Sequence, residues 1–333
     1  MLTAVTTEQS REIVLKKNEI PLLEEDEVLI KVSYCGVCGS DLHAYSHAKG
    51  YEFVQHPRIL GHEIVGEVAA VGNRLNEKTI GQKVIVQSMQ YCGTCENCIS
   101  GRYSICIYNE VIGLHFDGGM AEYVKTNIKY TNKIVSLKEQ IAVLAEPMSV
   151  AVHAIKKVEE LSEKNTVIVQ GAGIIGFFVA LLCADKGAKT YITGLKQDEL
   201  TRLNKFREFN LLTHIVDEGL ITEQADIVFE CSGSNAGVSS TFKQLKKGGK
   251  AVFVALYEED SSIFLTDLVR KEWPIIPSYG SDPTDYEEAL SILTKYANQL
   301  EGLMSYYPFE QVGEAFQDSL QQKVFKAIIT INN

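Results

Sequence analysis

Thr166-Val-Ile-Val-Gln170-Gly171-Ala-Gly173-Ile-Ile-Gly176 leads directly into an apolar segment from Phe177 to Lys186. The first five residues are largely β-branched and predict a buried strand, and the apolar segment predicts a helix. A strand, a glycine turn and a helix in this order are typical of a dinucleotide-binding unit, because the glycines permit a tight turn and a close approach of pyrophosphate to the helix N-terminus. The residues expected to contact such a cofactor are Gly171, Gly173, Ile174, Ile175 and Gly176.

Further strand-like segments follow this turn at regular intervals. They are Lys189–Thr193, Ala225–Glu230 and Lys250–Ala255, each apolar or β-branched at its centre. Strands that alternate with helical segments predict a parallel sheet covered by helices. We therefore expect an α/β fold with a Rossmann-type doubly wound sheet in this half of the chain.

The end of the second strand bears on the choice between NAD and NADP. An acidic residue there would bind the 2′-hydroxyl of the NAD ribose. The position holds Gly194, which is followed by Lys196, and a glycine with a nearby cation leaves room for a 2′-phosphate. The sequence thus slightly favours NADP over NAD, although Asp198 or Glu199 would reach the ribose if the loop were extended.

Length and charge restrict the classes of function. The chain has 333 residues, enough for two domains at roughly 150 residues each. Its 43 acidic residues against 32 lysines and arginines give a net charge of −11, which disfavours nucleic-acid binding. The longest aliphatic stretch, Ile174 to Ala184, is shorter than the ~20 residues of a membrane span, and the N-terminus lacks the features of a signal peptide. We expect a cytoplasmic protein with no membrane partner.

Four cysteines form a compact array. Cys92, Cys95, Cys98 and Cys106 have the spacing C-x2-C-x2-C-x7-C. Four thiolates on tight turns suit a tetrahedral zinc ion with Zn–S distances of about 2.3 Å, and no coordination position would remain open for a substrate. The pattern predicts a structural zinc site, with an iron–sulfur cluster as the weaker alternative.

A second group of potential ligands lies upstream. Cys35-Gly-Val-Cys38-Gly-Ser40-Asp41-Leu-His43 follows a predicted strand, Glu27–Tyr34, and Gly61-His62-Glu63 comes later. A thiolate, an imidazole and a carboxylate offered by different loops suit a catalytic zinc ion. By themselves these residues leave a redox-active cysteine pair and a surface His-Glu pair as alternatives.

Taken together, these segments resemble the zinc-dependent medium-chain alcohol dehydrogenase family over essentially the whole chain. The resemblance extends to Gly118-Gly-Met-Ala-Glu-Tyr123 and Ala145-Glu146-Pro147. Glu146 makes the chain look most like the polyol members, the sorbitol, galactitol-phosphate and butanediol dehydrogenases. The family implies a mostly β, GroES-like catalytic domain at 1–146 and 276–333 around a Rossmann dinucleotide-binding domain at 147–275.

The resemblance also implies the ligands of a catalytic zinc ion. Cys38 and His62 would bind the metal, and Glu63 and Glu146 would supply oxygen ligands directly or through water. Cys35 would then be a buried strand residue. Glu63 is alternatively a salt-bridge partner, and Glu146 alternatively ends a helix or binds backbone amides.

The implied reaction is reversible hydride transfer from a polyol, a polyol phosphate or another secondary alcohol to NAD(P)+, which yields a ketone. Ser40 would take the proton, His43 would relay it to solvent, and Asp41 would orient His62. Ser40 and Asp41 could instead cap a helix, and His43 could be a surface histidine. The alternatives are oxidation of L-threonine and a non-catalytic NADPH-binding relative. The family implies a homodimer or homotetramer.

Overall fold

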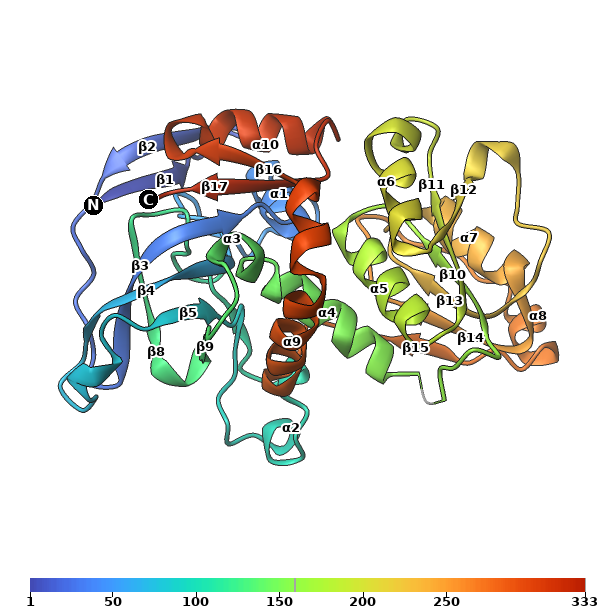
Figure 1. Ribbon diagram of the computed structural model, residues 1–333, viewed down its shortest axis with the longest axis horizontal. Helices are drawn as coiled ribbons and strands as arrows, with labels where there is room; N and C mark the ends of the chain where they lie inside the picture. Colours follow the sequence, from blue (N-terminus) through green and yellow to red (C-terminus); the bar gives the residue numbers. More distant parts are fainter. Residues whose placement is uncertain (159, 333) are drawn as a thin grey trace. The chain divides into compact units, whose positions relative to one another are not determined.

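The computed structural model describes residues 1–158 and 160–332 (Figure 1). Residue contacts divide the chain into two compact units. The first unit comprises Met1–Ser149 and the chain from Ser281 onward, and the second unit is Val150–Gly280. The assignment of the first unit to catalysis and the second to coenzyme binding stays a prediction.

The second unit contains a six-stranded sheet in which all neighbouring strands are parallel. Its order is β12-β11-β10-β13-β14-β15, so the first strand in the chain lies at the centre and the order reverses there. This arrangement is the Rossmann order, and the predicted fold class is confirmed. The strands are β10 (Thr166–Gln170), β11 (Lys189–Gly194), β12 (Leu212–Ile215), β13 (Ala225–Glu230), β14 (Leu245–Phe253) and β15 (Ile275–Pro277).

Helices cover this sheet and bury its apolar side chains. They are α5 (Ile174–Asp185), α6 (Asn204–Phe206), α7 (Asn235–Gln244) and α8 (Leu265–Arg270). The core is partly aromatic, since the rings of Phe177 and Phe206 stack with centroids 4.6 Å apart and both side chains are fully buried. Phe177 therefore packs in the core and is not available to stack on a bound base.

The first unit is built mainly from antiparallel strands. Its seven-stranded sheet has the order β16-β17-β3-β4-β5-β9, and β8 also pairs with β3. Its strands are β1 (Leu2–Thr6), β2 (Ile13–Lys17), β3 (Glu27–Gly36), β4 (Glu63–Val71), β5 (Lys83–Val86), β6 (Met89–Gln90), β7 (Glu110–Val111), β8 (Tyr123–Asn127), β9 (Thr131–Lys133), β16 (Met304–Pro308) and β17 (Lys326–Thr330).

The helices of the first unit are mostly short. They are α1 (Gly39–Tyr45), α2 (Glu96–Ile99), α3 (Glu139–Ala142), α9 (Pro283–Leu300) and α10 (Val312–Leu320), while α4 (Ala145–Lys156) begins in this unit and continues into the next. No helix in the described part of the chain has the length and apolar character that crossing a bilayer requires.

Strand register in the first unit brings distant residues to one place. Gly36 at the end of β3 lies opposite Glu63 at the start of β4, and it also lies opposite Ile328 of β17. The segments just outside these strand ends carry Cys38 and His62, and β17 begins with Lys326. The sheet thus gathers residues that are more than 260 positions apart in the chain.

Candidate metal and coenzyme sites

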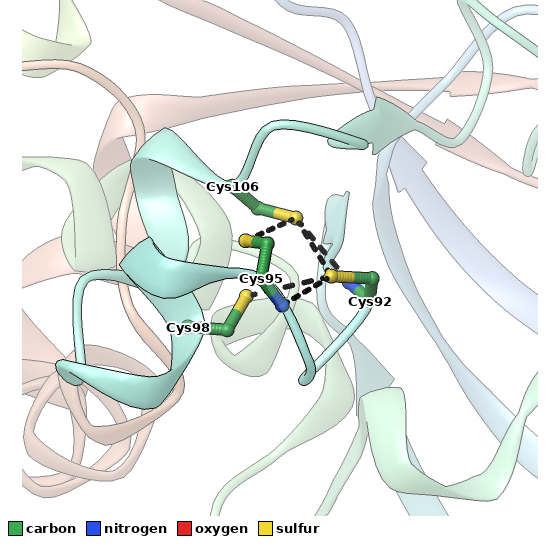
Figure 2. Close-up of side chains that lie close together, drawn as sticks. All are labelled: Cys92, Cys95, Cys98 and Cys106. Carbon is green, nitrogen blue, oxygen red and sulfur yellow. Dashed lines mark hydrogen bonds between the residues drawn. The ribbon is translucent and has the colours of Figure 1, made fainter.

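The four cysteines of the first array converge on a common centre (Figure 2). All four sulfur atoms lie within 4.8 Å of one another. The sulfur of Cys92 lies 4.0 Å from that of Cys98 and 3.5 Å from that of Cys106, and the sulfurs of Cys95 and Cys106 are 3.8 Å apart. Zn–S bonds of about 2.3 Å in a tetrahedron separate the sulfurs by about 3.8 Å. The cluster therefore fits a zinc ion.

Backbone amides surround these sulfurs and favour the thiolate form. The Cys92 sulfur accepts hydrogen bonds from the N–H groups of Thr94 at 3.4 Å and Cys95 at 3.3 Å. These amide contacts lower the pKa of Cys92 to about 6. Since the thiolate is the form that binds metal, the backbone around Cys92 favours its metal-binding form.

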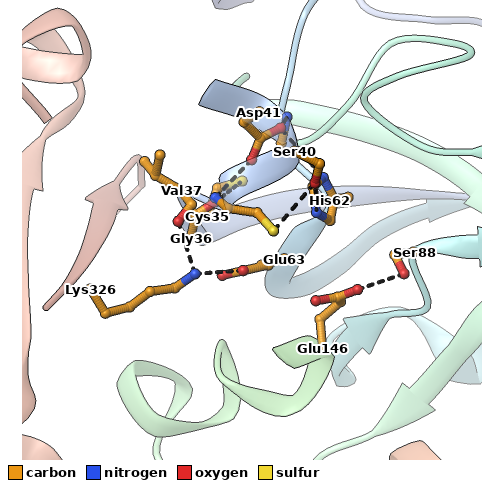
Figure 3. Close-up of polar contacts among 12 residues, drawn as sticks. Cys35, Gly36, Val37, Ser40, Asp41, His62, Glu63, Ser88, Glu146 and Lys326 are labelled. Atoms are coloured by element: carbon orange, nitrogen blue, oxygen red, sulfur yellow. Dashed lines mark hydrogen bonds and ion pairs between the residues drawn. The ribbon is translucent and has the colours of Figure 1, made fainter. Parts of the chain in front are cut away.

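Cys38 and His62 both contact the hydroxyl of Ser40, and Figure 3 shows Ser40 beside His62. The Ser40 Oγ atom lies 3.3 Å from the Cys38 sulfur and 3.3 Å from Nε2 of His62. Cys38 stands at the N-cap of α1, and Ser40 follows in its first turn. The thiol, the hydroxyl and one ring nitrogen are thus brought together by the end of β3 and the start of β4.

Asp41 holds the loop that carries Cys38 and the loop that carries Gly61 and His62. Its side chain is fully buried, and its two oxygens accept hydrogen bonds from the backbone N–H groups of Cys38 at 2.9 Å and Gly61 at 3.0 Å. Its Oδ1 atom also lies 3.3 Å from Nδ1 of His62. Burial alone lowers the pKa of His62, but the charges of Asp41 and Cys38 outweigh it and hold that pKa well above its usual value. Asp41 therefore acts on the ring nitrogen opposite the one that faces Cys38, and it also belongs to the capping box of α1.

Glu63 forms a buried ion pair with Lys326. The Lys326 ammonium lies 2.5 Å from Oε1 of Glu63 and donates to the carbonyl of Val37 at 2.9 Å, and Figure 3 shows this side chain extended toward Glu63. Oε2 of Glu63 is buried and has no hydrogen-bond partner among the described residues. A Cβ atom at Gly36 would lie 1.9 Å from this oxygen, so only glycine leaves it room.

Glu146 lies in the first turn of α4 and not at the end of a helix. It is 8% exposed, and its Oε1 atom accepts a hydrogen bond from Ser88 Oγ at 2.8 Å. The backbone N–H of Ser88 in turn donates to the hydroxyl of Tyr286 at 2.9 Å. Burial raises the pKa of Glu146, as expected for a carboxylate removed from water.

The proposed ligands of the catalytic zinc ion do not form a compact set in the structure. In the described residues, Cys38, His62, Glu63 and Glu146 do not provide three donor atoms that all lie within 4.8 Å of one another, whereas the four cysteines do. The donor types and the unpartnered Glu63 oxygen nevertheless suit zinc. Cys35 is fully buried in β3, as expected.

Other predicted and unpredicted residues complete this region. The ring of His43 stacks on Tyr51 with centroids 5.2 Å apart, one helical turn beyond Ser40. The sequence analysis missed Lys326, Ser88 and Tyr286. A lysine at the start of the apolar strand Lys326-Ala-Ile-Ile-Thr330 was the one signal that could have indicated a buried ion pair.

The glycine turn of the second unit has the geometry that a dinucleotide requires. Gly171 has a φ of +104°, and a Cβ atom at Gly176 would lie 2.0 Å from the Gly171 carbonyl oxygen. Gly173 is the N-cap of α5, and a Cβ there would have no atom within 4 Å. Gly171 is thus required by its positive φ, and Gly176 is required by its close packing. Gly173 leaves the N-terminus of α5 accessible to a ligand. Ile174 and Ile175 form the first turn of this helix.

Comparison with known proteins identifies both units. Residues 24–139 match the alcohol dehydrogenase GroES-like domain, and residues 175–295 match the zinc-binding dehydrogenase domain. A sorbitol dehydrogenase of Halalkalibacterium halodurans is 30% identical over 93% of both chains, and an L-galactonate-5-dehydrogenase of Escherichia coli is 27% identical over 99% of both.

Solved structures share the same fold. A zinc-binding dehydrogenase of Sinorhizobium meliloti bound to NADP has a TM-score of 0.89 at 24% identity, with 99% of each chain covered. An alcohol dehydrogenase of Escherichia coli in complex with NADH has a TM-score of 0.87 at 23% identity, again with 99% of each chain covered. At this level of identity the likeness shows the fold alone.

Proposed function

Because the chain belongs to the zinc-binding alcohol dehydrogenase family, we propose that it is a zinc-dependent enzyme that transfers a hydride from a polyol or sugar-derived secondary alcohol to NAD(P)+. The observation that carries the proposal is the convergence of Cys38 and His62 on the Ser40 hydroxyl inside the GroES-like domain. The relatives named above act on a polyol and on a sugar acid, which supports a polyhydroxylated substrate.

Cys38 and His62 would hold the catalytic zinc ion, with Glu63 and Glu146 as oxygen donors directly or through water. When bound, zinc supplies Lewis acidity that lowers the pKa of an alcohol hydroxyl, and the nicotinamide supplies the hydride acceptor. Asp41 orients His62 through Nδ1 and leaves Nε2 facing the Cys38 sulfur and the Ser40 hydroxyl. The four cysteines would hold a second, structural zinc ion.

Ser40 would take the substrate proton. Its hydroxyl lies between the two proposed metal ligands, and a hydroxyl can accept and donate a proton at the same time. His43 lies on the same helix and would pass that proton to solvent, since an imidazole ring can both accept and donate a proton.

Two alternatives have less support. L-Threonine oxidation would use the same metal chemistry, but the relatives described above favour a polyhydroxylated substrate. A non-catalytic NADPH-binding protein would have no need for the convergent thiol, imidazole and carboxylate groups.

Steady-state rates test the function directly. Zinc-loaded protein would be assayed with NAD and NADP against sorbitol, xylitol, butanediol, galactitol 1-phosphate and threonine, with reduced nicotinamide followed by absorbance. Turnover of a polyol supports the proposal, and turnover of threonine alone would replace it with the first alternative. Tight nicotinamide binding at full zinc occupancy without turnover of any secondary alcohol would favour the second alternative.

Removal of one cysteine tests the structural zinc site. We expect Cys106→Ser to lose about half of the bound zinc and to unfold at a lower temperature, because a four-thiolate site contributes its binding free energy to folding. Metal content by elemental analysis and a thermal melt measure both effects. Cys183→Ala, which removes a buried thiol of α5, is the control and should retain all of the zinc. Unchanged zinc content in Cys106→Ser would contradict the site.

We also propose that the chain forms a homodimer or homotetramer, with an interface at β15. This strand ends the sheet order and pairs only with β14 among the described strands, so its outer edge is available. The neighbouring helix α8 exposes Leu265 at 66% and Val269 at 73%, and Phe264 before it is exposed at 70%. Light scattering should give a molar mass for the wild-type protein that is a multiple of the chain mass. The Val269→Lys variant should give a lower molar mass. A monomeric wild-type protein would refute the proposal.

The preference between NAD and NADP depends on the loop that contains Gly194 and Lys196. The sequence-based preference for NADP rests on Gly194 and Lys196. The contacts around these two residues favour NAD, for the reasons given below.

A further inference from the structure

The loop that follows β11 has both of its first backbone N–H groups bound to carboxylates. The N–H of Leu195 donates to Oδ2 of Asp198 at 2.8 Å, and the N–H of Lys196 donates to Oδ2 of Asp217 at 3.0 Å. Backbone N–H groups at this place are the donors that a ribose 2′-phosphate would need. Here they are already satisfied by two negatively charged side chains.

The loop lies beside the glycine turn, where the adenosine ribose of a dinucleotide is expected. Gly194 ends β11, and a Cβ atom built on it would lie 3.0 Å from the Cβ of Ala172 in the turn. The same Cβ would lie 3.1 Å from Oδ2 of Asp198. A carboxylate thus occupies the neighbourhood in which the last residue of this strand usually supplies the acid that binds the 2′-hydroxyl.

The two carboxylates differ in what they can still bind. Asp198 is only 5% exposed and forms an ion pair with Arg202 at 3.2 Å, so its charge is compensated inside the protein. Asp217 is exposed and follows β12, whose residue Ile215 lies opposite Gly194 in the parallel sheet. Asp217 is therefore the more accessible of the two carboxylates.

The positive charge of Lys196 does not make the loop favour NADP over NAD. Lys196 is exposed, and a single solvated ammonium on a flexible side chain contributes little to an ion pair. Asp217 is held by a hydrogen bond to the backbone of that same residue, so a 2′-phosphate that reached the loop would also meet this carboxylate. Like charges repel one another, whereas a hydroxyl can donate a hydrogen bond to the carboxylate.

We propose that Asp217 is a specificity-determining residue that selects NAD over NADP by accepting a hydrogen bond from the ribose 2′-hydroxyl and repelling a 2′-phosphate. This inference rests on the proposed function, and it reverses the preference that Gly194 and Lys196 indicate in the sequence. The acid comes from the turn that follows the neighbouring strand β12 and not from the end of β11.

Nucleotide binding tests the inference without turnover. The zinc-loaded wild-type protein, Asp217→Asn and the control Glu218→Gln would be titrated with NADH and NADPH, with dissociation constants from the fluorescence of the reduced nicotinamide. Glu218 is an exposed acid next to Asp217 in the same turn, so its variant removes the same charge from the adjacent position. A thermal melt of each variant checks the fold.

The wild type should bind NADH about tenfold or more tightly than NADPH, and added salt should narrow the difference. Asp217→Asn should raise the affinity for NADPH about tenfold and weaken NADH binding a few-fold, while Glu218→Gln should change neither ratio by more than about twofold. Tighter binding of NADPH by the wild type, or an equal response of the two variants, would overturn the inference but leave nucleotide binding intact. Failure to bind either nucleotide would instead refute the proposed function.

Discussion

Replacement of Cys38 by serine is expected to lower kcat/KM by about three orders of magnitude or more, because a metal site of this kind contributes several kcal/mol to transition-state stabilisation. The hydroxyl of serine is a poor substitute for a thiolate toward zinc. The fold should survive, since Cys38 caps α1 through backbone contacts with Asp41 that serine can preserve. Steady-state kinetics, metal analysis and a thermal melt on the same preparation provide the three readouts.

The matched control for this experiment is Cys35→Ala. Cys35 is three residues away and fully buried in β3, so its loss affects packing and not a proposed ligand. We expect this variant to keep its catalytic zinc and most of its activity. Turnover close to wild type in a metal-verified Cys38→Ser protein would refute the assignment of the catalytic ligand.

Replacement of Lys326 by methionine should destabilise the zinc-free protein by about 3–5 kcal/mol, because it leaves the carboxylate of Glu63 buried without a counter-charge. Both side chains are almost completely buried, at 2% and 0% exposure. Burial by itself lowers the pKa of Lys326, but the charges of Glu63 and Cys38 outweigh it and raise that pKa, so the lysine is charged. Chemical denaturation followed by circular dichroism measures the free energy of unfolding.

Two further variants separate this ion pair from a general effect of losing a lysine. The double variant Glu63→Gln with Lys326→Met removes both charges and should recover most of the stability. Lys323→Met removes a lysine that is 60% exposed and paired with Asp318, and it should have little effect. Less than about 1 kcal/mol lost in Lys326→Met would mean that Glu63 is neutral or finds another partner.

The sequence predicted the second unit well because its signals are local. The ranges 166–170 and 225–230 are strands with the predicted bounds, and the glycine turn joins β10 to α5 as expected. The predicted strand at 250–255 was placed too late, since β14 runs from Leu245 to Phe253. Gly248, at a φ of +73°, lies within this strand, where the pairing with β13 shifts register.

The candidate sites were predictable only in part. The four-cysteine array is local in sequence, so spacing alone was enough to predict it. The partners of Glu63 and Glu146 were not predictable, because Lys326 reaches Glu63, and Ser88 reaches Glu146, across long separations in the chain. Asp217 was not predictable for a similar reason, because it lies in the turn after the next parallel strand and is 21 residues away from the N–H of Lys196 that it binds.

The order of strands in the chain also sets when each unit can be completed during synthesis. The second unit is one uninterrupted segment, so its whole sheet is available once residue 280 has been made. The first unit needs β17, which pairs with β3 and begins at Lys326, seven residues before the end of the chain. Because domains fold as units, the nascent chain carries the carboxylate of Glu63 without its cation until Lys326 has been made.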